Sequence, residues 1–84
     1  MVTELIGFVG ASRLREKLME SLSTSSEPMD VSMFAKSARE VQHACKRTME
    51  ELVEKGLARP EENGYVITDL GIKVIATMKG TRST

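Results

Sequence analysis

The stretch that decides the fold is residues 39–56, REVQHACKRTMEELVEKG. Its apolar residues recur at spacings of three and four, which is the period of a helix with one buried face. These residues are Val41, Cys45, Met49 and Leu52, with Thr48 beside them. At about 100° per residue, the opposite side is polar. It carries Arg39, His43, Lys46, Arg47 and Glu50. The pattern predicts an amphipathic helix from Arg39 to Gly56.

The polar side of this predicted helix is sorted by charge. Its first half carries Arg39, His43, Lys46 and Arg47 against a lone Glu40. Its second half carries Glu50, Glu51 and Glu54 against only Lys55. A helix that served only solubility would intermix its charges. The cations and hydrogen-bonding groups therefore gather at the N-terminal end, the end that a recognition helix presents to DNA.

The composition indicates a small domain without covalent or metal support. A chain of 84 residues buries only about 60% of the surface that its unfolded form exposes, so its core is marginal. The single Cys45 excludes an internal disulfide, and one cysteine with one histidine cannot build a structural zinc site. We therefore expect no metal and no cofactor, and a homodimer as the remaining source of stability.

Charge and aromatic content limit the class of partner. The twelve basic residues equal the twelve acidic ones, which counts against nucleic-acid binding unless the cations are clustered on one face. Two Phe, one Tyr and no Trp argue against a stacking surface for single strands or RNA. No signal peptide and no apolar run of membrane-spanning length is present, so we expect a cytoplasmic protein.

The N-terminal half contains three predicted helices. Residues 1–10, MVTELIGFVG, form a short apolar helix that either packs on the core or makes a subunit contact. Ser12 can cap a second helix whose buried positions are Leu14, Leu18 and Leu22 and whose water-facing positions are Arg13, Arg15, Glu16, Lys17 and Glu20. Asp30 caps a third, which ends near Lys36 or Ser37, with Met29 and Phe34 spaced as a hydrophobic staple.

The C-terminal half begins with a predicted hairpin over residues 57–67. Residues 57–59 and 65–67 are the strands, and Asn63 and Gly64 supply the positive φ of the turn. Thr68 and Asp69 then start a last helix that ends at Gly80, followed by a disordered tail, residues 81–84. Its wide apolar surface, with Ile72, Ile75 and Ala76 beside the main stripe, indicates a second partner or deep burial.

Three runs of this chain resemble a known family. They are MDVSMFAK, VQHACKRTMEELVEKGLAR and GYVITDLG. They are similar to the winged helix-turn-helix transcription regulators of archaea and bacteria, the group that includes MarR-like and ArsR-like repressors. The shared pattern is an Ala in the helix before the recognition helix, E-L-x-x-x-G-L at the end of the recognition helix and Y-x-L-T-x-x-G after the wing. It falls on Ala35, Glu51, Leu52, Gly56, Leu57, Tyr65, Ile67, Thr68 and Gly71.

The resemblance covers nearly the whole chain and implies a mainly α fold with a small β-hairpin. It further implies a single winged-helix domain over residues 1–80, with the hairpin as its wing. It also implies a homodimer, formed through the N-terminal segment and the C-terminal helix, that binds double-stranded DNA and regulates transcription. Two copies one DNA turn apart, about 34 Å, would read a palindrome.

The expected DNA contacts come from the third predicted helix, which Asp30 caps, from the turn after it, from the recognition helix and from the wing. Gln42 and His43 reach base edges, and Lys46 and Arg47 contact bases or phosphates. Ser32, Lys36 and Arg39 touch the flanking backbone, and Arg59 lies near the base of the wing.

The alternative is a winged-helix protein-interaction module that does not bind DNA. Zero net charge and the acidic hairpin tip, Glu61 and Glu62, favour it. The i, i+4 spacing would also let Lys46 pair with Glu50 and Arg47 with Glu51, which makes those cations an ordinary solvated face.

We do not expect an enzyme. Cys45 and His43 are two residues apart on a helix, so their side chains point roughly 200° from each other and cannot share a proton. The run GFVGAS has neither the lysine nor the spacing of a phosphate-binding loop.

Overall fold

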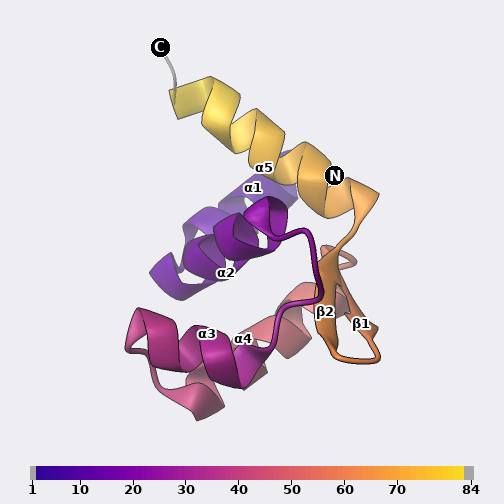
Figure 1. Cartoon of the computed structure of the whole chain (residues 1–84). Coiled ribbons are helices and arrows are strands. Elements are labelled where there is room, and N and C mark those ends of the chain that lie inside the picture. The colour runs from indigo at the N-terminus through magenta and orange to yellow at the C-terminus, as the bar shows by residue number, and fades with distance from the viewer. Residues whose placement is uncertain (1, 83–84) are drawn as a thin grey trace.

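The computed structural model describes residues 2–82 as helices packed on a short hairpin (Figure 1). The elements in order are α1 (Val2–Gly10), α2 (Arg13–Thr24), α3 (Val31–Ala38), α4 (Gln42–Glu54), β1 (Ala58–Glu61), β2 (Gly64–Ile67) and α5 (Asp69–Arg82). The predicted class, mainly α with a small antiparallel hairpin, is confirmed. Figure 1 shows α5 and α1 at one end of the molecule and α3 and α4 at the other, with α2 between them.

The core lies where α2 and α4 meet the other elements. Its completely buried side chains are Val9, Leu18, Met19, Cys45, Met49, Leu52, Leu57 and Val74. The predicted buried faces of α2 and α4 are thus confirmed at Leu18 and Leu22 and at Cys45, Met49 and Leu52. One position in the stripe was predicted wrongly, because Val41 is 68% exposed.

Arg15 on α2 was expected to face water, and the structure corrects this. Its guanidinium lies 3.9 Å from the centre of the Phe8 ring, and Nη1 donates a hydrogen bond to the Phe8 carbonyl at 2.8 Å. Its Nε also lies 3.3 Å from a carboxylate oxygen of Glu51. Arg15 therefore connects α1 and α2 to the outer side of α4.

The apolar residues of α1 pack against this chain's own core. Val9 is completely buried, and Val2, Leu5, Ile6 and Phe8 are partly buried against the core cluster. The segment therefore offers less free apolar surface for a subunit contact than the sequence indicated.

The start of α3 is held from two directions. The Asp30 carboxylate accepts hydrogen bonds from the amides of Ser32 at 2.8 Å and Met33 at 3.3 Å, which confirms the predicted cap. One residue earlier, Met29 pairs with Tyr65 of β2 in an antiparallel bridge. The Met29 amide donates to the Tyr65 carbonyl at 2.7 Å, and the Tyr65 amide donates to the Met29 carbonyl at 3.0 Å. The sequence did not reveal this bridge.

The turn between α3 and α4 corrects the predicted start of the central helix. Helix α3 continues to Ala38, slightly beyond the predicted end, and Arg39 adopts the left-handed conformation with φ 57° and ψ 41°. The Glu40 amide donates to the Ala35 carbonyl at 2.9 Å and closes the end of α3. Arg39 and Glu40 therefore lie outside α4, whose N-cap is Val41. Arg39 takes the conformation for which glycine is usually selected at a helix end.

The hairpin is longer and tighter than predicted. Its strands pair from Ala58 opposite Ile67 to Glu61 opposite Gly64, which leaves Glu62 and Asn63 as the loop. Gly64 has φ 154°, but Asn63 does not have the positive φ that we predicted. The difference arises because strand pairing continues through residues that the sequence indicated as the connection.

Helix α5 starts as predicted and ends later. The Thr68 hydroxyl accepts a hydrogen bond from the Gly71 amide at 3.1 Å and donates one to the Gly56 carbonyl at 2.6 Å. The helix continues through Gly80 to Arg82, so the predicted end and the first part of the predicted tail are wrong. Residues 83–84 of that tail lie outside the described residues.

Candidate nucleic-acid interface

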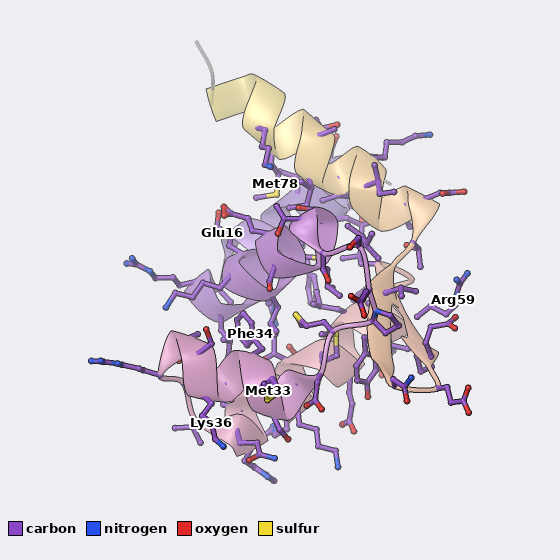
Figure 2. The ribbon with its side chains drawn as sticks, viewed as in Figure 1. Glu16, Met33, Phe34, Lys36, Arg59 and Met78 are labelled. Atoms are coloured by element: carbon purple, nitrogen blue, oxygen red, sulfur yellow. The ribbon has the colours of Figure 1, made fainter. Side chains whose placement is uncertain are left out.

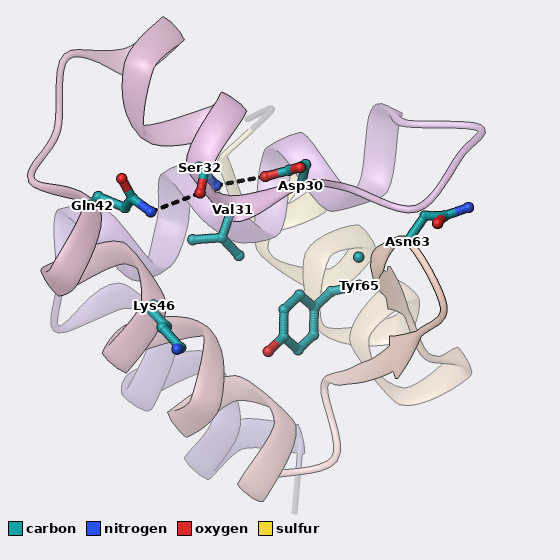
Figure 3. A pocket seen from close by; sticks show the side chains of 8 residues that line it. Asp30, Val31, Ser32, Gln42, Lys46, Asn63 and Tyr65 are labelled. Atoms are coloured by element: carbon teal, nitrogen blue, oxygen red, sulfur yellow. Dashed lines mark hydrogen bonds between the residues drawn. The ribbon is translucent and has the colours of Figure 1, made fainter.

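The N-terminal ends of α3 and α4 meet on one exposed face of the molecule. The Gln42 side-chain amide donates a hydrogen bond of 2.7 Å to the Ser32 hydroxyl, and both residues are exposed (Figure 3). Ser32 is also the first residue whose amide donates to Asp30. Because the start of α3 is capped and bridged to β2, this bond fixes the first turn of α4 relative to the hairpin.

A cleft of about 280 Å³ opens between these two helix ends and the hairpin. Its lining residues are Asp30, Val31, Ser32, Gln42, Lys46, Asn63, Gly64 and Tyr65. Figure 3 shows the side chains of Lys46, from α4, and Tyr65, from β2, extending into the same space from opposite sides. The cleft thus presents an ammonium group, a phenol and hydroxyl and amide groups, together with the Asp30 carboxylate, one oxygen of which accepts from the amides of Ser32 and Met33. This set suits a polar, anionic surface such as a phosphate backbone.

The cations beside this cleft are not engaged by carboxylates. Lys36, Arg39, Lys46 and Arg47 are all exposed, and none of them is in an ion pair within residues 2–82. His43 is also exposed, on the side of α4 away from the core.

The cations that do form ion pairs lie elsewhere. Arg15 pairs with Glu51 at 3.3 Å and Lys17 with Glu40 at 2.8 Å. Glu51 is thus turned toward α2, and neither of the two i, i+4 pairs considered from the sequence, Lys46–Glu50 or Arg47–Glu51, is formed. The charge of Lys46 and Arg47 is therefore available to a partner.

Arg59 does not join the other predicted site residues. It lies on β1, and its Nε is 3.1 Å from a carboxylate oxygen of Glu61 on the same strand. Figure 2 shows Arg59 beside the hairpin, well away from Lys36 on α3. The structure therefore gathers Ser32, Gln42 and Lys46 at the cleft and leaves Lys36, Arg39, His43 and Arg47 exposed on the α3–turn–α4 segment.

Three residues of this face were missed from the sequence. Tyr65 was assigned only to the hairpin, yet it lines the cleft. Val41 and Met33, which are 68% and 65% exposed, are the two most exposed large hydrophobic residues of the described chain. No sequence signal marked Val41 as exposed, because its spacing from Cys45 matches the buried stripe. Its exposure follows from its position at the N-cap, before the first turn of α4.

The buried side of α4 contributes no reactive group. Cys45 is completely buried, and burial raises the pKa of its thiol above the ordinary value. Glu40 nearby raises this pKa further, and Lys17 opposes the effect. A thiol in this state is neutral near pH 7 and acts as a small apolar side chain.

The described residues offer neither a metal-binding cluster nor a membrane-spanning helix. Residues 2–82 hold no cluster of three or more His, Cys, Asp and Glu side chains suited to a metal ion. Within the same range, no helix has the length and apolar character needed to cross a membrane.

Comparisons with family models, with curated proteins and with solved structures found no match to this chain.

Proposed function

We propose that this protein is a winged-helix transcription regulator that binds double-stranded DNA as a homodimer. The observation that carries the proposal is the contrast between the cations beside the cleft and the cations that form ion pairs. Those at the start of α4 and on the adjoining turn and α3 are exposed and free of carboxylates, whereas Arg15, Lys17 and Arg59 are paired. Although the chain has zero net charge, its described part thus gathers four exposed and unpaired cations on the α3–turn–α4 segment, where phosphate contacts require positive charge. Other exposed cations, such as Lys73 on α5, lie on other elements.

In this proposal α4 enters the major groove with its first two turns. Gln42 and His43 contact base edges, while Lys46 and Arg47 contact bases or phosphates. Helix α4 also has no side-chain cap, so the first amides of the helix are open to an acceptor from DNA. Ser32, Lys36 and Arg39 flank this end and contact the DNA backbone.

The hairpin has a smaller role than the resemblance implies. Its loop residue Glu62 is exposed, and Glu61 neutralises the nearest cation, Arg59. Because carboxylates repel phosphates, the tip points away from DNA in this proposal. The base of the hairpin, where Tyr65 lines the cleft, is the part that approaches the backbone.

The proposed homodimer uses α5, at the end of the molecule away from α3 and α4 (Figure 1). Ile72 on this helix is 51% exposed, and Ala76, four residues later, is also exposed. Since residues at i and i+4 share a helix face, a second copy of α5 would cover both. This arrangement leaves α4 of each copy free to face DNA.

The test is a binding titration on genomic DNA fragments at several salt concentrations. We expect wild-type affinity to fall steeply with salt, and Lys46→Ala to weaken binding to all fragments similarly while lowering the salt slope by about 1. The matched control is Lys73→Ala, which removes an exposed lysine from α5. It should leave the slope unchanged. Absence of binding to every fragment at low salt would overturn the proposal.

The acidic hairpin tip favours one other function, a protein-interaction module on the same scaffold. In that case DNA binding would be absent, and a pull-down would yield a protein partner whose association survives Arg47→Ala. The unpaired state of Lys46 and Arg47 favours DNA over this alternative.

A further inference from the structure

We propose that Val41 is a sequence-determining residue that contacts the C5-methyl group of a thymine in the major groove. This inference rests on the proposed function, since it assigns a base preference to the same face. The major groove presents one apolar group, the thymine methyl, and small apolar side chains are the residues that read it.

The first observation is that Val41 contributes nothing to the core. It is 68% exposed, more than any other large hydrophobic residue of residues 2–82, although its spacing from Cys45 matches the buried stripe. Helix α4 begins only after it, so Val41 extends from the turn beyond the packed part of the helix. Its apolar side chain is therefore left for an external contact.

The second, independent observation is that Val41 is unsuited to its backbone position. It is the N-cap of α4, with φ −70° and ψ 123°, and it makes no side-chain cap bond. Ser, Thr, Asp and Asn are strongly preferred at this position and Val is strongly disfavoured. The other helices with a described cap use such residues, namely Ser12, Asp30 and Thr68. A residue that fails both as a cap and as a core residue indicates a functional position.

The neighbouring groups determine which base pair is read. Gln42, the next residue, donates one side-chain N–H to Ser32, which leaves its second N–H and its carbonyl oxygen free. Those two groups match the N7 acceptor and the N6 donor of adenine. The Ser32 contact fixes the orientation of the Gln42 amide. An adenine read by Gln42 and a thymine methyl touching Val41 therefore predict A·T pairs at the centre of each half-site.

The unpaired cations around Val41 identify DNA as the occupant of this apolar position. Arg39 precedes it by two residues, and Lys46 and Arg47 follow on the same helix, all exposed. A hydrophobic protein surface would not require these unpaired cations on the same segment as the exposed Val41. The polyanionic duplex does, and it offers the methyl group within it.

The experiment uses a random-sequence duplex library, from which the full chain selects its binding sites. The selected duplex is then synthesised with each thymine replaced singly by deoxyuridine, which removes only the methyl group. We expect one thymine position per half-site at which the replacement weakens binding about fourfold, the ratio that corresponds to about 0.8 kcal/mol per buried methylene-sized group. Other thymine positions should show no change.

The variant Val41→Ser tests the residue, because it removes both methyl groups of the side chain, whereas threonine would keep one that can touch a thymine methyl. We expect the thymine-over-uracil preference at that position to fall below twofold. The matched control is Thr24→Ser at the end of α2, which removes a methyl group from an exposed residue outside both proposed interfaces and should retain the preference. Thermal unfolding followed by circular dichroism shows that both variants are folded.

The possible outcomes separate this inference from the proposed function. Recovery of no binding duplex from the library would overturn both. Binding with equal affinity for thymine and uracil at every position would overturn the inference and leave the proposed function standing. A preference that persists unchanged in Val41→Ser would overturn the role of Val41 alone.

Discussion

The two helices that meet at the Gln42–Ser32 hydrogen bond begin in opposite ways. Helix α3 begins with Asp30, whose carboxylate accepts from two amides, and Met29 before it is paired with Tyr65. Helix α4 begins with Val41, which is exposed and makes no cap bond. One helix end is thus fixed to the scaffold, whereas the other keeps its first amides and its apolar cap residue open.

This difference separates stability from recognition within a few residues. A capped and paired helix end is stabilised by the chain itself and needs no partner. The start of α4 lacks the stabilisation that a capping side chain would give it, so a ligand that supplies hydrogen-bond acceptors would stabilise it. Substitutions at the two ends should therefore change unfolding free energy with opposite signs.

The largest effect is expected at the hairpin residue that contacts the start of α3. A Cβ on Gly64 would collide with the carbonyl of Met29, and Gly64 also has φ 154°. We expect Gly64→Ala to lower the free energy of unfolding by about 3 kcal/mol, measured by urea denaturation, because backbone on both sides must move.

The control for this substitution is Gly7→Ala in α1. A Cβ there would meet nothing within 4 Å, so we expect a gain of about 0.5–1 kcal/mol from helix propensity. Equal losses for the two variants would show that the Met29–Gly64 approach is unimportant.

A smaller loss is expected when the cap of α3 is removed. Asp30→Ala leaves the amides of Ser32 and Met33 without their acceptor and should destabilise the protein by about 1–2 kcal/mol. Asp30→Asn keeps an acceptor and should recover most of that loss in the same denaturation experiment. A loss of the same size in both variants would instead show that the negative charge of Asp30, rather than its acceptor oxygen, stabilises the helix.

The smallest effect, with the opposite sign, is expected at the start of α4. Val41→Ser introduces a cap where none exists and gives up little burial, so the unfolding free energy should rise by about 0.5–1 kcal/mol. A measured loss of stability would show that Val41 packs within the free protein, which contradicts the division drawn between the two helix ends.

Much of the fold could be predicted from local patterns. The periods of Leu18 and Leu22 and of Cys45, Met49 and Leu52 located the buried faces of α2 and α4. Asp30 and Thr68 marked true helix starts, because their side chains act on amides two or three residues away. Such signals are local, so they survive without knowledge of the tertiary structure.

The boundary between α3 and α4 was not available to the same reasoning. The stripe from Val41 to Leu52 predicts a continuous helix, and only the left-handed Arg39 shows where α3 ends. The candidate site depends on this boundary. With α4 starting at Gln42, Arg39 lies in the turn and Val41 is an exposed cap residue. Arg59 lies near the base of the hairpin, as the sequence indicated, but its pairing with Glu61 depends on how strand β1 extends.

The sequence by itself determined that a helix is followed by a hairpin in residues 42–67, that Cys45, Met49 and Leu52 form the buried face of α4, and that cations cluster at the N-terminal side of this helix. These properties follow from periodicity and from side-chain chemistry within a few residues. The tertiary structure alone decided which of those cations are free of ion pairs. Arg15 and Lys17 of α2 pair with Glu51 and Glu40, respectively, so these carboxylates do not pair with the cations of α4. Such pairings join residues 23 or 36 positions apart, a separation over which the sequence carries no geometric information.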